Sequence, residues 1–138
     1  MKRLLLDTPV LLWWLADDPK LGTNARVDIS DGRNEIYVSA ASSWEISIKK
    51  RNGKLKGPDN IDTIVEQERF IKLPIALVHG EVAGQLPDHH KDPFDRMLIA
   101  QAQNEGLTIL TADEKFRKYD AGVVMATAEC ERDTGNET

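Results

Sequence analysis

Four acidic residues are the part of this sequence whose types and positions could do chemistry: Asp7, Glu45, Asp95 and Asp113. Asp7 ends a run of three leucines, and Asp113 comes shortly after a second apolar run at residues 107–110. Glu45 and Asp95 fall in the first turns of two predicted helices. Carboxylates that converge without cations repel each other, and a hard divalent ion such as Mg²⁺ or Mn²⁺ relieves that repulsion. The pattern indicates metal-assisted hydrolysis, in which the ion activates water and neutralises charge on a phosphate.

Each acid also has a purely structural interpretation. Ser42-x-x-Glu45 matches a capping box, in which the glutamate folds back onto a backbone N–H. Asp95 could simply complement the positive end of a helix, and Asp7 and Asp113 could be N-caps. Their common position favours a shared site, because ligands of an open parallel sheet bind beyond the carboxyl ends of its strands.

Other catalytic patterns are weaker in this sequence. His89-His90 followed by Asp92 suggests zinc, but the only other histidine is His79, and no second ligand group supports a zinc site. The sequence has no glycine-rich phosphate loop, no dinucleotide fingerprint and no convincing Ser-His-Asp order. The ligands of the ion are therefore expected to be oxygen atoms.

The elements that must position these acids alternate along the chain. Short apolar runs predict buried strands at residues 4–6, 36–38, 107–110 and 123–125, with a further extended piece at 70–74. Helical spacing and end signals predict helices at 8–16, 23–32, 42–51, 60–69, 76–85 and 93–105, with a short one from 114. Asp92 is the predicted N-cap of the helix at 93–105, and Pro93 is its first residue. This alternation predicts an α/β domain with a parallel sheet of four to five short strands flanked by helices.

Composition is that of a globular protein, with 41% hydrophobic and 30% charged residues in a chain of 138. We expect one domain at residues 1–128, followed by an acidic, flexible tail at 129–138. The formal charge is −5, and the tail, with four acids and one arginine, carries −3 of it. The single cysteine, Cys130, indicates a reducing compartment. Because Asp7 breaks the apolar start and no long apolar run follows, we expect a cytoplasmic protein without signal peptide or membrane span.

Two further clusters point to partners. A basic cluster lies within eight residues and consists of Lys49, Lys50, Arg51, Lys54 and Lys56. It is either a solvated helix end or a contact for nucleic-acid phosphates. Trp13 and Trp14 are neighbours in an almost wholly apolar helix, so they cannot both face the same sheet. One is expected in the core and the other on a flank, covered by a protein partner or by another helix of this chain.

Four sequence blocks are also familiar as a set: Leu-Leu-Leu-Asp7-Thr8, Val-Ser-Ala-Ala-Ser-Ser-Trp-Glu45, Asp-Pro-Phe-Asp95-Arg-Met-Leu-Ile-Ala-Gln-Ala and Leu-Thr-Ala-Asp113. In this order and spacing the chain resembles the PIN-domain nucleases and, more narrowly, the VapC-type toxins of bacterial type II toxin–antitoxin pairs. The resemblance implies that the four acids are the family's quartet around Mg²⁺ or Mn²⁺. It also implies that Thr111 is the hydroxyl beside the last acid and that Asp92 is a flanking acid.

The same resemblance implies a ribonuclease that a cognate antitoxin holds inactive and that usually forms a homodimer. RNA is then the polyanion that we expect the basic cluster to bind. An antitoxin segment or the second subunit is expected to cover whichever of the two tryptophans lies on the flank. Two alternative functions fit parts of this sequence. A receiver-type phosphoacceptor needs an acid after a middle strand, where this chain has Ser39. A PIN-like interaction scaffold without activity is the other, and the intact quartet argues against it.

Overall fold

The computed structural model describes residues 1–127. The predicted tail at residues 129–138, with Cys130, and the last residue of the predicted domain lie outside the described residues. Within the described part, five strands alternate with helices in one α/β domain. The fold class expected from the sequence is confirmed.

The sheet consists of five short strands: β1 (Arg3–Leu6), β2 (Glu35–Ser39), β3 (Ile71–Leu73), β4 (Thr108–Thr111) and β5 (Gly122–Met125). Their order is β3-β2-β1-β4-β5, and each neighbouring pair is parallel. In the central strand, Leu5 pairs with Tyr37 on one side and with Ile109 on the other. Because all five strands run the same way, their carboxyl ends meet at one edge of the sheet.

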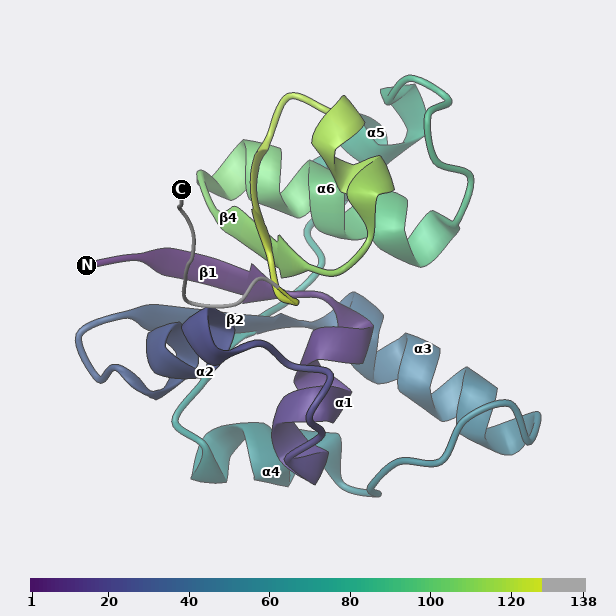
Figure 1. The fold of residues 1–138 in the computed structure, drawn as a ribbon. Coiled ribbons are helices and arrows are strands. Elements are labelled where there is room, and N and C mark those ends of the chain that lie inside the picture. The colour runs from purple at the N-terminus through teal and green to yellow at the C-terminus, as the bar shows by residue number, and fades with distance from the viewer. Residues whose placement is uncertain (128–138) are drawn as a thin grey trace.

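The described residues form six α-helices and one 3₁₀ helix: α1 (Thr8–Ala16), α2 (Thr23–Ser30), α3 (Ala40–Arg51), α4 (Ile61–Gln67), α5 (Leu77–Gln85), α6 (Pro93–Glu105) and η1 (Glu114–Lys118). Figure 1 shows α1, α2 and α4 on one face of the sheet and α5 and α6 on the other. Leu4 and Leu6 pack with the first group, whereas Leu5 packs with the second. β1 is therefore apolar at successive positions because both of its faces are covered.

The strand order separates this fold from the receiver alternative, whose sheet has the order 2-1-3-4-5. Here the chain moves outward from β1 to β2 and β3, and then returns to place β4 and β5 on the other side of β1. Such a reversal leaves a crevice between the carboxyl ends of the two central strands, which is where open parallel sheets bind ligands. Asp7 directly follows β1, and Thr111 is the last residue of β4. The topology thus argues against a receiver and puts the crevice at the predicted acids.

Helix α6 begins and ends as its sequence predicts. Asp92 is the N-cap, and its carboxylate accepts the backbone N–H of Asp95 at 2.9 Å. Pro93 is the first helical residue, where its missing N–H leaves no hydrogen bond unmade. Gly106 ends the helix in the left-handed conformation, with φ of 69°. These end signals fix the position of Asp95 in the first turn.

Helix α3 begins earlier than its sequence predicts. The predicted start was Ser42, but the helix starts at Ala40, directly after β2. Ser39 is the N-cap, and its hydroxyl accepts the N–H of Ala41 at 3.0 Å. Glu45 consequently lies in the second turn instead of the first. The capping-box interpretation of Glu45 is wrong, because its carboxylate is directed to other side chains.

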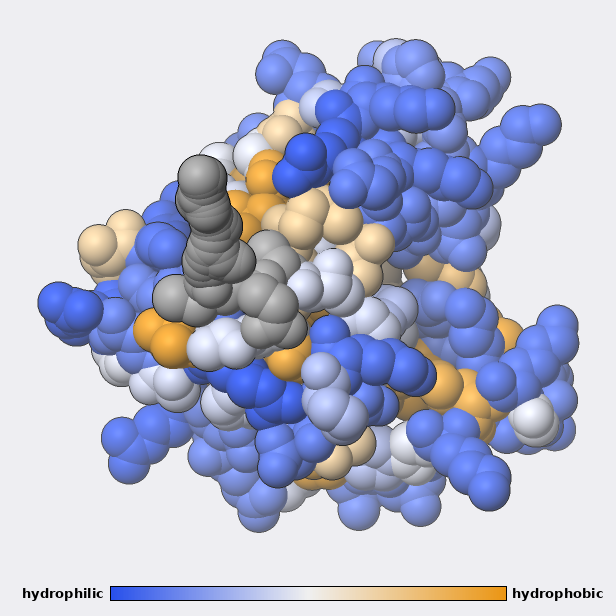
Figure 2. Space-filling view, viewed as in Figure 1, coloured by the Kyte–Doolittle hydropathy of each residue, from blue (hydrophilic) through white to orange (hydrophobic). Residues whose placement is uncertain are grey.

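No helix among residues 1–127 is long and apolar enough to cross a membrane. The face shown in Figure 2 is mostly hydrophilic, and apolar surface gathers between α1 and α3. That apolar surface lies next to the carboxyl edge of the sheet, where α1 and α3 begin (Figure 1).

Candidate metal centre

Asp7 and Asp113 meet across the crevice between β1 and β4, where Thr111 joins them. The hydroxyl of Thr111 donates to Asp7 Oδ2, and its oxygen accepts the N–H of Asp113 at 3.0 Å. The two aspartates are also N-caps: Asp7 accepts the N–H of Val10 at 3.0 Å, and Asp113 that of Lys115 at 2.9 Å. The capping interpretation of both aspartates is therefore confirmed, and capping fixes where each carboxylate points without excluding a shared site.

Burial raises the pKa of Asp7 to about 6. The hydrogen bonds from Thr111 and Val10 lower this pKa, whereas the nearby charges of Asp113 and Glu45 add to the rise. At neutral pH the ionised Asp7 side chain is thus held in the crevice at a cost in free energy. A bound cation would offset this cost.

Glu45 enters the crevice from α3 and is buried against two partners. Thr8 Oγ1 donates to one carboxylate oxygen at 2.6 Å, and Lys49 Nζ donates to the other at 2.5 Å. The hydrogen bond to Glu45 is the main reason that the pKa of Lys49 is raised. Thr8 was not among the predicted site residues, and it lies 37 positions away from Glu45 in the sequence. The i, i+4 spacing of Glu45 and Lys49 was the available signal for their ion pair.

Asp95 reaches the crevice from the first turn of α6. Its pKa is raised to about 8, first by burial and then by four neighbouring acids: Asp92, Asp7, Glu45 and Asp113. The side chain is only 19% exposed, and among the described residues no hydrogen bond is donated to its carboxylate. The strongest demand for a compensating cation therefore falls on Asp95.

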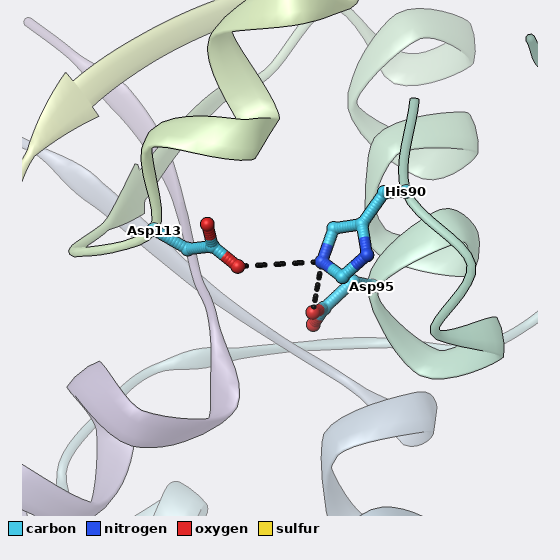
Figure 3. A group of neighbouring side chains, drawn as sticks. All are labelled: His90, Asp95 and Asp113. Carbon is cyan, nitrogen blue, oxygen red and sulfur yellow. Dashed lines mark ion pairs between the residues drawn. The ribbon is translucent and has the colours of Figure 1, made fainter. Parts of the chain in front are cut away.

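A histidine that the sequence analysis did not place in the site also faces these acids. His90 Nε2 lies 2.7 Å from Asp95 Oδ2 and 3.3 Å from Asp113 Oδ2 (Figure 3). Its side chain is 9% exposed. Both contacts are ion pairs when the imidazole is protonated, yet this buried nitrogen has no hydrogen-bond partner within residues 1–127. The sequence had linked His90 only to a weak zinc pattern with His89.

The loop that carries His90 is fixed by neighbouring side chains. The guanidinium of Arg96 donates to four backbone carbonyls at 2.8–3.1 Å, those of Ala83, Leu86, Pro87 and His90. The Tyr119 hydroxyl accepts the N–H of His90 at 2.8 Å, and the Phe116 ring packs edge-to-face on the imidazole at 5.8 Å. The imidazole is therefore held in place by α6 and η1.

The donor set of this crevice fits a divalent cation. One ligand atom each from His90, Asp95 and Asp113 lies within 4.8 Å of the others. Asp7 and Glu45 are close enough for their charges to raise the pKa of Asp95. The crevice thus brings together the whole predicted quartet, with Thr111 and Asp92 beside it. The prediction of oxygen ligands alone did not include the imidazole.

The predicted basic cluster is divided between two environments. Lys49 belongs to the acidic crevice, and Lys50 forms an ion pair with Asp59. The remaining side chains are exposed, and the described part of the chain shows no ion pair for them: Arg51, Lys54 and Lys56. These three cations, at the end of α3 and in the loop after it, are the ones free to contact phosphates.

The two tryptophans of α1 also have different surroundings. Trp14 donates to Glu68 at 2.7 Å and packs near Phe70, with 6.4 Å between the ring centroids, so another part of this chain covers it. Trp13 lines a groove of about 600 Å³ between α1, α3 and the segment leading into α4. Glu45 also lines this groove, which therefore continues into the acidic crevice.

Comparison with known protein sequences gives a consistent set of relatives. A family model described as PIN domain matches residues 4–122. Ribonuclease VapC22 of Mycobacterium tuberculosis is 27% identical over 124 residues, which cover 86% of this chain and 93% of that protein. Ribonuclease VapC16 of the same organism is 37% identical over 71 residues, about half of each chain (47% and 50%).

Solved structures with a similar fold come from several bacteria. The VapBC2 structure from Rickettsia felis, bound to a promoter DNA fragment, superposes with a TM-score of 0.65 at 14% identity, covering 89% of this chain and 98% of that chain. DNA-bound VapBC from Salmonella typhimurium has a TM-score of 0.65 at 18% identity, with coverages of 91% and 98%. At such identities these structures establish the fold alone.

Proposed function

This chain belongs to the PIN domain family, and on that basis we propose that it is a metal-dependent endoribonuclease, the toxin of a type II toxin–antitoxin pair. The observation that carries the proposal is the meeting of four acids at the switch point of the sheet: Asp7, Glu45, Asp95 and Asp113. The two curated relatives are named ribonucleases, which supports RNA as the substrate. A cytoplasmic location is part of the same proposal.

When bound, Mg²⁺ or Mn²⁺ would supply two things to this centre: neutralisation of charge on the transferring phosphate and a lower pKa for a bound water. Asp7, Asp95, Asp113 and Glu45 are the carboxylates that would hold the ion. Thr111 fixes the orientation of Asp7 through its hydroxyl, and Lys49 keeps Glu45 turned into the crevice. The described side chains thus set the ligand geometry before any substrate arrives.

The RNA backbone has a natural path away from this centre. Arg51, Lys54 and Lys56 follow Glu45 along α3 and into the next loop, so they extend from the acids toward solvent. Cations in such a position contact phosphates without reading sequence. We expect binding through them to weaken steeply as salt is raised.

The direct test is cleavage of a fluorogenic single-stranded RNA. The wild-type protein should cleave with Mn²⁺, lose activity after dialysis against chelator, and recover it when Mn²⁺ is added back. Asp95→Asn should be inactive, whereas the matched control Asp88→Asn, at a side chain that is 90% exposed, should keep activity. Full cleavage in chelator would contradict the metal mechanism. Metal binding without cleavage of any RNA would favour the inactive scaffold.

We further propose that an antitoxin segment occupies the groove beside Trp13. A toxin–antitoxin complex from Klebsiella pneumoniae is among the solved structures with a similar fold, which supports an antitoxin as the partner. The groove is lined by apolar side chains of α1 and of the chain before α4, such as Leu12 and Leu55, and it leads to Glu45. An apolar segment lying there would reach the acidic crevice. A homodimer is the proposed assembly of the toxin itself, and light scattering of the purified protein tests it.

The tryptophan pair tests the antitoxin surface. Trp14→Ala should cost about 2 kcal/mol of unfolding free energy, because Trp14 packs near Phe70 and bonds Glu68. Trp13→Ala should leave folding nearly intact and weaken capture of the protein encoded by the adjacent gene. Thermal melting and pull-down measure the two effects. Equal destabilisation by both variants, with unchanged capture, would place the partner surface elsewhere.

A further inference from the structure

His90 is a buried polar group that the proposed chemistry above does not use. Its side chain is nine-tenths buried and points into the acidic crevice (Figure 3). Within the described residues, Nε2 is the buried side-chain nitrogen or oxygen that lacks a hydrogen-bond partner. A buried polar atom without a partner costs free energy comparable to a lost hydrogen bond. A ligand bound by the protein at this point would explain why Nε2 lacks a hydrogen-bond partner among the described residues.

The distances around Nε2 are those expected between ligands of a common ion. In six-coordinate sites with bonds of about 2.1 Å, adjacent ligand atoms lie about 3 Å apart. The observed separations are 2.7 Å to Asp95 Oδ2 and 3.3 Å to Asp113 Oδ2. The same distances suit an ion pair of a protonated imidazole, but within the described residues Nε2 forms no hydrogen bond with either oxygen. The three atoms converge instead, as ligands do.

The loop around His90 is built to hold this position. Arg96 binds the carbonyl of His90 at 3.1 Å, and Tyr119 binds its N–H at 2.8 Å. The other ring nitrogen, Nδ1, lies 3.4 Å from the N–H of Asp92, which is at the far limit of a hydrogen bond. Coordination through Nε2 requires the proton on Nδ1, so only this weak contact would be given up.

We propose that His90 Nε2 is a direct ligand of the divalent cation, together with Asp95 and Asp113. The inference rests on the proposed metal-dependent function and adds to it a mixed nitrogen and oxygen donor set. Mg²⁺ prefers oxygen ligands, whereas imidazole suits transition metals. The consequence is selectivity: this centre prefers Mn²⁺, and more strongly Zn²⁺, to Mg²⁺.

Metal binding measured by calorimetry, without RNA, tests the assignment. Three proteins are titrated with Mn²⁺ and with Mg²⁺: the wild type, His90→Gln, and His89→Gln as the matched control. His89 is the exposed neighbour, and its ring packs on Tyr119 without facing the acids. His90→Gln should lower Mn²⁺ affinity about tenfold or more and Mg²⁺ affinity less than about threefold. His89→Gln should leave both affinities unchanged.

The other outcomes overturn the assignment. Equal losses for both ions would show that His90 only positions Asp95, and unchanged affinities would show a structural histidine. Tighter binding of both ions by His90→Gln would show that the imidazole occupies the place of the cation. If the wild-type protein binds no divalent ion, the proposed function fails as well, whereas the first three results leave it standing.

A measurement on the wild-type side chain does not depend on how the variant folds. The chain has three histidines, so ¹⁵N spectra resolve His90 from His79 and His89, with His89→Gln confirming the assignment. Adding Zn²⁺, a diamagnetic probe, should shift Nε2 of His90 and move its proton to Nδ1. An Nε2 resonance that keeps its proton in the Zn²⁺-loaded protein would refute direct coordination.

Discussion

The two sides of the acidic crevice differ in how many hydrogen bonds the chain itself supplies to their carboxylates. On the α1/α3 side, Asp7 accepts hydrogen bonds from Val10 and Thr111. Glu45, also on this side, accepts from a hydroxyl and from the ammonium of Lys49. On the α6/β4 side, Asp95 accepts no hydrogen bond from the described residues and lies 2.7 Å from a histidine nitrogen that also lacks a hydrogen-bond partner among them.

Because of this difference, we expect the α1/α3 side to orient the carboxylates and the α6/β4 side to supply most of the affinity for the ion. The α1/α3 side is arranged in advance by hydrogen bonds, and one of its two charges is already neutralised by Lys49. The α6/β4 side concentrates uncompensated negative charge, since burial and then four neighbouring acids raise the pKa of Asp95 to about 8. Ion binding should therefore draw most of its free energy from the α6/β4 side. Four predictions, from the largest effect to the smallest, test that division.

Removing one carboxylate from each side should give the largest effects. Asp7→Asn and Asp95→Asn should each reduce kcat/KM for RNA about a hundredfold or more, on the scale of losing one electrostatic stabiliser. Mn²⁺ affinity, measured by calorimetry, should fall further for Asp95→Asn than for Asp7→Asn. If both variants were strongly destabilised yet cleaved RNA normally, these aspartates would be structural caps.

The stability of the metal-free protein should fall as pH rises. The folded-state pKa of Asp95, about 8, exceeds its value of about 4 in an unfolded chain, so the folded protein binds that proton more tightly. The stability it contributes is complete below pH 4 and is lost as pH rises toward 8. In chelator at pH 8, Asp95→Asn should thus be about 2 kcal/mol more stable than wild type, after discounting for partial exposure.

Urea denaturation at pH 5 and pH 8 measures this effect. The advantage of Asp95→Asn should shrink at pH 5, and saturating Mn²⁺ should reverse it, because only the wild-type centre keeps its full charge for the ion. Asp88→Asn serves as the control and should keep the wild-type pH dependence. A wild-type protein equally stable at both pH values in chelator would argue against uncompensated charge on the α6/β4 side.

On the α1/α3 side, the Thr111 hydroxyl is one of the two donors that orient Asp7. Thr111→Val removes the donor to Asp7 and the acceptor for the N–H of Asp113. We expect about a tenfold loss of cleavage and a loss of about 1–3 kcal/mol of stability, because buried polar groups lose their partner. Thr108→Val, at the other end of β4, is the control and should change neither. Normal cleavage by Thr111→Val would mean that Asp7 keeps its orientation without this bond.

The smallest predicted effect concerns the cation already in the crevice. Lys49→Met removes a positive charge next to Glu45, so Mn²⁺ affinity should rise about fivefold, equivalent to roughly 1 kcal/mol. Lys50→Met is the matched control, because Lys50 pairs with Asp59 away from the acids. Weaker Mn²⁺ binding by Lys49→Met would show that Lys49 is needed to orient Glu45 for the ion.

Local chemistry in the sequence determined much of the framework. Apolar runs marked the strands, and Asp92-Pro93 with Gly106 marked both ends of α6. Asp7 and Asp113 could be predicted at the carboxyl edge because each follows an apolar run of a parallel sheet. These signals act over a few residues, so they are readable before the chain folds. The placement of Asp7, Asp95 and Asp113 follows from them, whereas Glu45 was predicted one turn too early in its helix.

Only the tertiary structure decided what each acid contacts. The start of α3 shifted to Ala40 because Ser39 supplied the cap at the end of β2, which left Glu45 to meet Thr8 from another helix. His90 lies next to Asp113 because Arg96 donates hydrogen bonds to four backbone carbonyls within residues 83–90 and so holds this segment in place. Such contacts join residues far apart in the chain, and no periodicity or end signal encodes them. Their geometry exists only once both layers have packed on the sheet.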